Sequence, residues 1–116
     1  MSQIADFSDS EMWTIDTTLR ERFGEPVAVE LAESDIRLRS SDRELTTCPI
    51  AYWERGDCHF VVIKCGDRRY RCQFFYRIHQ QYGTGIKEYD DLAECVVTLL
   101  QAQADHARGR RSQAND

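Results

Sequence analysis

The order of hydrophobic and polar residues divides the chain into two helices with a run of short strands between them. Near the start, hydrophobic residues recur at spacings of three and four: Met12, Ile15, Leu19 and Phe23. This spacing places them on one side of a helix. Ser8 or Ser10 can cap the beginning of this helix, and Gly24 followed by Pro26 marks its end.

The middle of the chain predicts about five strands. Hydrophobic and polar residues alternate over residues 27–31 and again over 36–39, as they do in a strand with one buried face. Three longer segments follow, at residues 45–53, 59–65 and 70–78, and turns at Gly56 and Gly66 separate them. Because short turns join these segments, we expect neighbouring strands to be antiparallel.

A loop containing Gly83 and Gly85 leads to the last predicted helix. Its buried side is expected to carry Tyr89, Leu92, Val96, Leu99 and Leu100. The sequence places its end near residue 106 and predicts a disordered C-terminal tail over residues 107–116. Residues 1–106 then form a single α+β domain. It is a two-layer sandwich, in which one antiparallel sheet of about five strands has the N-terminal and the C-terminal helix packed on one face.

Composition excludes several classes of protein. The chain has 116 residues, 41% of them hydrophobic, which suits a single globular domain. No apolar stretch approaches the roughly 20 residues that a membrane span needs, so we expect no membrane partner. The five cysteines are odd in number and lie mostly within predicted strands and a helix, which favours reduced thiols and a cytoplasmic location.

The charges are unevenly distributed. Twenty acidic residues against fifteen basic ones give a net charge of −5, which disfavours bulk nucleic acid as the main partner. With both helices on one face, however, the other face of the sheet is left open. Alternation along the strand at residues 70–78 turns Arg69, Arg71, Phe75 and Arg77 toward this open face, and we expect Arg37 and Arg39 to join them.

Two interpretations of this arginine-rich face stay open. Arginines interleaved with an aromatic residue can bind a phosphate, a nucleic-acid strand or an acidic peptide. Alternatively, the face is simply solvated, as one face of an antiparallel sheet often is. Trp53 is a further aromatic candidate, and Trp13 on the acidic first helix is a candidate anchor for a basic partner.

Candidate chemistry is sparse. Cys58, Cys65 and Cys72 recur every seven residues, whereas zinc sites use closely spaced cysteine pairs. A cysteine nucleophile would pair Cys58 with His79 or His106, but no local signature of such an enzyme surrounds these residues. The glycine-rich loop lacks the full phosphate-loop pattern. We therefore expect no catalytic residue, no metal and no cofactor.

The sequence thus predicts a small non-enzymatic accessory or regulatory protein that binds another protein through a charged surface containing aromatic residues. The candidate partner-binding residues are Trp13, Arg37, Arg39, Trp53, Arg69, Arg71, Phe75 and Arg77. The alternative is a nucleic-acid-binding protein that uses the open arginine-rich sheet face. A homodimer is left open.

Overall fold

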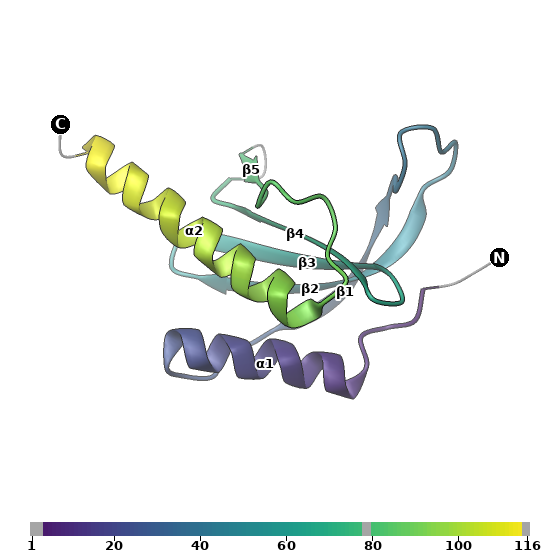
Figure 1. Ribbon diagram of the computed structural model, residues 1–116, viewed down its shortest axis with the longest axis horizontal. Coiled ribbons are helices and arrows are strands. Elements are labelled where there is room, and N and C mark those ends of the chain that lie inside the picture. Colours follow the sequence, from purple (N-terminus) through teal and green to yellow (C-terminus); the bar gives the residue numbers. More distant parts are fainter. Residues whose placement is uncertain (1–3, 78–79, 115–116) are drawn as a thin grey trace.

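The computed structural model describes residues 4–77 and 80–114. Two helices flank five strands in the chain order (Figure 1). Their bounds are α1 Asp9–Phe23, β1 Glu30–Ile36, β2 Thr46–Arg55, β3 Cys58–Gly66, β4 Arg69–Phe75, β5 Gln81–Tyr82 and α2 Leu92–Ala114. Ile78, predicted to continue the strand that contains Phe75, and His79 lie outside the described residues.

The strands form one antiparallel sheet in the order β1-β2-β3-β4-β5, so each strand pairs with its neighbours in the chain. A register shift between Lys64 and Gly66 marks an irregularity in the β3–β4 pair. Both helices lie over the same face of this sheet, and together they form the second layer (Figure 1). The predicted α+β sandwich with a five-stranded sheet is confirmed.

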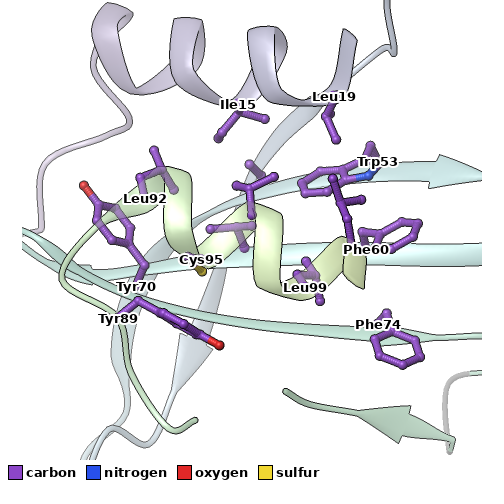
Figure 2. Close-up of a cluster of buried hydrophobic side chains, with 14 of the residues drawn as sticks. Ile15, Leu19, Trp53, Phe60, Tyr70, Phe74, Tyr89, Leu92, Cys95 and Leu99 are labelled. Carbon is purple, nitrogen blue, oxygen red and sulfur yellow. The ribbon is translucent and has the colours of Figure 1, made fainter. Parts of the chain in front are cut away.

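The main core fills the space between the two layers (Figure 2). Ile15 and Leu19 reach it from α1, and Leu99 reaches it from α2. The sheet contributes large rings, among them Trp53 and Phe60, whose centroids lie 5.4 Å apart with nearly parallel planes. Because these side chains are at most 1% exposed, they account for much of the apolar area that stabilises the fold.

Local signals fix both ends of α1. The Ser8 hydroxyl accepts a hydrogen bond from the Glu11 N–H at 3.2 Å, and the Glu11 carboxylate accepts one from the Ser8 N–H at 2.8 Å. This reciprocal pair is a capping box. Gly24 ends the helix with φ = 76°, a left-handed conformation that favours glycine. The predicted beginning and end of this helix are confirmed.

A buried ionic cluster joins α1 to the sheet. The Lys64 ammonium on β3 donates to the Glu11 carboxylate at 2.8 Å and to the Asp6 carbonyl oxygen at 3.0 Å. The Tyr70 hydroxyl on β4 donates to the other carboxylate oxygen of Glu11. Burial raises the pKa of Glu11, but the hydrogen bonds from Lys64, Tyr70 and Ser8 outweigh burial and leave the pKa below its ordinary value.

Two of the five strands differ from those that the sequence predicts. Residues 27–31 and 36–39 are expected to form two strands, whereas the structure has one strand, β1, that covers the residues between them. The fifth strand is the short β5 in the loop before α2, where no strand is predicted. β1 lies at an edge that the helices do not cover, and Leu31 is 55% exposed there, so burial imposes no alternation on its sequence.

α2 is longer than the sequence predicts. Its first turn is capped by Asp91, whose carboxylate accepts a hydrogen bond from the Ala93 N–H at 3.0 Å. At the other end the helix continues to Ala114 instead of stopping near His106, so residues 107–114 are helical where a disordered tail is expected. Its last turns extend beyond the sheet (Figure 1). This segment is rich in alanine, glutamine and arginine, which favour the helix even with Gly109 inside it.

Candidate binding surface

The sheet face that points away from the helices is here called the outer face. One end of it is closed: Cys48, Ile63 and Cys65 form a small second core. Partly buried residues from the N-terminal segment, from the β1–β2 hairpin and from the sheet itself pack against this core: Ile4, Ile36, Leu38, Ile50 and Val61. The rest of the outer face is not covered by any described helix or strand.

Three stacked rings cross this uncovered part on three neighbouring strands. We call Tyr52, His59 and Phe75 the ring row. The ring centroids of His59 and Phe75 lie 4.9 Å apart at an interplanar angle of 15°, and those of Tyr52 and His59 lie 5.9 Å apart at 23°. The β-ladder register pairs His59 with Phe75 and with Glu54 on the other side. The ring row is therefore a cross-strand stack built into the sheet.

The stacking decides which part of each ring faces solvent. Rings on adjacent strands that stack on one another turn their flat sides along the sheet, so their edges point outward. Tyr52 and His59 are also locked together, since the Tyr52 oxygen and His59 Nδ1 share a hydrogen bond at 2.5 Å. Burial raises the pKa of Tyr52, and the nearby Glu54 and Glu30 carboxylates raise it further. The hydroxyl therefore stays protonated at neutral pH.

A single carboxylate holds two of the predicted arginines. Glu88, from the segment before α2, accepts hydrogen bonds from both Arg69 and Arg71. The Arg71 guanidinium also donates to the Leu38 carbonyl oxygen at 2.8 Å. The hydrogen bond from Arg69, together with the charges of both guanidinium groups, holds the pKa of Glu88 below its ordinary value against the opposing effect of burial. Both arginines lie on the predicted face, but their charge is partly neutralised there.

The remaining arginines do not join the sheet surface. Arg37 and Arg39 follow the end of β1 at Ile36, and they are exposed in the β1–β2 connection. The expectation that they extend the outer face is therefore wrong. The hydrophobic residues that alternate with them pack against the second core instead. Arg77 is exposed beyond the end of β4 at Phe75.

The two tryptophans also lie apart from the ring row. Trp53 is 1% exposed and faces the helices, so it belongs to the core and is not a surface anchor. The reason is its pairing with Phe60, which places both side chains under α1 and α2. Trp13 is 69% exposed on α1, in the helix layer. It stays available, but the sheet separates it from the outer face.

Sequence reasoning did not single out Tyr52 and His59. The signal lies in the turn at Gly56, because the hairpin around this turn sets the register that pairs Glu54 with His59. With that register and the burial of Phe60, alternation alone turns Tyr52 and His59 toward the outer face. Glu88 carries no comparable local signal, since it reaches the arginines from a loop.

Other kinds of site find little support in the part of the chain that the structure describes. Within residues 4–77 and 80–114, no group of three or more histidine, cysteine or acidic side chains is placed to hold a metal ion. All five cysteines lie among the described residues, and none of them forms a disulfide bond there. None of the described helices combines the length and the apolar composition needed to cross a membrane. Comparisons with protein-family models, with curated proteins and with solved structures found no significant match.

Proposed function

We propose that this chain is a small accessory protein without catalytic activity and that it binds another protein through the uncovered part of the outer face. The ring row is the observation that supports this proposal. It places three aromatic side chains on the central strands β2, β3 and β4, at the end of the outer face next to the β2–β3 turn, and no described helix or strand covers them.

The geometry of the ring row suits a protein partner. Binding surfaces gain most from large side chains that lose little conformational freedom on binding. The stack and the Tyr52–His59 hydrogen bond hold these rings in place before a partner arrives. On one side of the row, Val61 pairs with Tyr52 and connects the rings to the second core, which extends the apolar surface in that direction.

The surrounding charge indicates what kind of partner fits. Glu54 lies beside the ring row, with its carboxylate 3.8 Å from His59 Nδ1 and its side chain 55% exposed. Glu30 occupies the neighbouring row of the same face, paired with Tyr52. An apolar patch bordered by these carboxylates favours a partner surface with lysine or arginine at its rim. Binding should then weaken moderately as the salt concentration rises.

The same geometry weighs against the nucleic-acid alternative. Single-stranded nucleic acids bind open sheets by stacking bases on the flat sides of aromatic rings. In the ring row those flat sides are largely occupied by neighbouring rings. The phosphates would also need free basic groups, whereas Glu88 engages Arg69 and Arg71. We further propose a cytoplasmic location, because five described cysteines without a disulfide bond suit a reducing compartment.

The test compares three forms of the full chain as bait in host lysate, with quantitative mass spectrometry of the captured proteins. In the first variant, Tyr52→Thr and Phe75→Thr remove two rings while keeping residues that favour strands. The matched control is Trp13→Thr, which removes an exposed ring from the helix layer. Circular dichroism verifies that all three forms are folded.

We expect one or a few proteins to be captured by the wild type and by Trp13→Thr but to be lost from the double variant. Equal capture by all three forms, or capture of nothing, would refute the proposal. Labelled single-stranded and double-stranded oligonucleotides form a second arm. Salt-sensitive binding that the double variant loses would favour the nucleic-acid alternative. A wild-type dimer that the double variant abolishes, seen by sedimentation, would assign the outer face to a second copy.

A further inference from the structure

The two edges of the sheet differ in how much of their backbone is paired with other segments. The β4 side is closed at both ends: Tyr70 and Tyr89 exchange two backbone hydrogen bonds of 2.8 Å, and β5 pairs with Phe74 and Phe75. On the β1 side, all seven residues pair with β2 in one unbroken register, and no described segment pairs with the other edge of β1 (Figure 1). β1 therefore presents a full-length open edge.

This edge lacks the structural devices that usually block strand pairing. Natural edge strands are blunted by proline, by a bulge, by shortness or by a covering segment. β1 has seven residues without proline or glycine, and its register with β2 shows no shift. Only side-chain charge remains as protection, in the form of Glu30, Glu33 and Asp35. Charge of one sign repels a like strand but attracts one of opposite charge.

The β1 side chains on the helix side of the sheet are one apolar residue followed by two acidic residues. Leu31, Glu33 and Asp35 point to the helix side of the sheet, because they pair with Ala51, Pro49 and Thr47. Leu31 is 55% exposed, which leaves an apolar position without a cover. Glu33 is exposed and takes part in no ion pair among the described residues, whereas Asp35 accepts a hydrogen bond from the Thr47 hydroxyl at 2.7 Å.

We propose that the free edge of β1 binds an extended, basic segment of another protein, which adds to the sheet as a sixth strand. In an antiparallel arrangement, the segment carries basic residues opposite Asp35 and Glu33, and an apolar residue opposite Leu31. Its sequence therefore reads basic, any, basic, any, apolar. Backbone hydrogen bonds provide the affinity, and these alternate side chains provide the selectivity. This surface is separate from the outer face, so the inference does not depend on the function proposed above.

A second copy of this chain is a poor occupant of the edge. Two β1 strands that pair about a two-fold axis at Glu33 place this residue opposite itself, and Leu31 then lies across from Asp35. Like charges directly opposite one another in adjacent strands are destabilising. The three acids, with no basic residue in β1, thus select against the homodimer and for a lysine- or arginine-containing strand.

The test uses a synthetic seven-residue peptide, Thr-Lys-Thr-Lys-Thr-Ile-Thr, with blocked ends and a fluorescent label. The control peptide has the same sequence with every backbone nitrogen methylated, which keeps the charge and the side chains but removes the donors that strand pairing needs. The protein variants are Glu33→Lys at the edge and Glu21→Lys on α1, an exposed glutamate far from β1 in the chain. Fluorescence anisotropy measures affinity, and amide hydrogen exchange locates the bound peptide.

We expect the peptide to bind the wild type and to slow amide exchange within residues 30–36. Glu33→Lys should weaken binding by about tenfold, whereas Glu21→Lys should change it by less than about threefold. The inference is overturned if no binding occurs at about 1 mM peptide, or if the N-methylated peptide binds equally well. It is also overturned if both variants weaken binding equally, or if β1 is already protected in a dimer of this chain.

Discussion

Replacing Glu11 with glutamine would isolate the role of charge in the buried cluster that joins α1 to the sheet. Glutamine can still accept from the Ser8 N–H, because it serves as well as glutamate in a capping box. Its amide nitrogen then takes the place of the carboxylate oxygen that faces Tyr70, and it can donate to the Tyr70 hydroxyl oxygen. What the substitution removes is the carboxylate partner of Lys64, whose side chain is only 9% exposed. The variant therefore leaves a buried ammonium group without a counter-charge.

The surroundings of Lys64 determine how much stability the Glu11→Gln variant should lose. Removing one partner of a buried ion pair costs about 3–5 kcal/mol. Lys64 keeps its hydrogen bond to the Asp6 carbonyl, and its ammonium lies 6.0 Å from the centre of the Phe7 ring. We therefore expect the free energy of unfolding to fall by about 3 kcal/mol, the lower end of that range. With a urea dependence of about 1.5 kcal/mol per molar, the denaturation midpoint falls by about 2 M.

Urea unfolding at pH 7, followed by tryptophan fluorescence and circular dichroism, measures this effect. Glu21→Gln, an exposed change on the same helix, should stay within about 0.5 kcal/mol of the wild type. Lys64→Met combined with Glu11→Gln should cost less than the two single changes together, because neither charge is then left alone. Costs that add within about 0.5 kcal/mol would refute the reasoning.

Acid titration gives a second readout of the same residue. The pKa of Glu11 is lower in the folded protein than in the unfolded chain, where it is about 4.3. The unfolded chain then binds more protons, so the stability that Glu11 contributes is present above about pH 4.3 and is lost as the pH falls through the folded pKa. The stability difference between the wild type and Glu11→Gln should therefore shrink below that pH.

Three further substitutions, one of them with a matched control, test other parts of the structure. Gly24→Ala should cost about 1 kcal/mol in thermal unfolding because φ is 76° there, whereas Gly83→Ala, which has open space around it, should be nearly neutral. Gly109→Ala should increase the helical circular dichroism signal and stabilise the last turns of α2 by about 0.5–1 kcal/mol; an unchanged signal would contradict a helix that reaches Ala114. Glu88→Gln should raise the salt concentration needed to elute the protein from heparin, since it releases Arg69 and Arg71, and an unchanged elution would show that these arginines are not masked.

The parts of the fold that could be predicted from the sequence are the helices and strands with one buried face, because such a face requires hydrophobic residues at a regular spacing. α1 shows this, since Ile15 and Leu19 lie against the sheet at the predicted spacing. β1 shows the opposite. Glu33 and Leu31 share one face of that strand, and both are exposed, so nothing selects for alternation in its sequence. A strand at an uncovered edge is held by backbone pairing, which leaves little trace in the side chains.

The binding surface could be predicted only in part, for a related reason. Phe75 and Arg71 share the predicted face because alternation within one strand suffices to place them. Predicting that Tyr52 and His59 lie next to each other requires the register between β2 and β3, which depends on the hairpin at Gly56. The pairing of Glu88 with the arginines joins β4 to a loop before α2, and such a contact follows only from the assembled fold.

The closed β4 edge limits how large an assembly this sheet can build. A sheet with two open edges can add strands on both sides, and repeated addition leads to fibres. Here the Tyr70–Tyr89 bridge and β5 occupy one side, so each molecule offers a single site for strand addition. Once a strand has paired with β1, the sheet of this chain has no second full-length open edge among the described residues. Strand addition by this chain alone therefore cannot repeat to build a fibre.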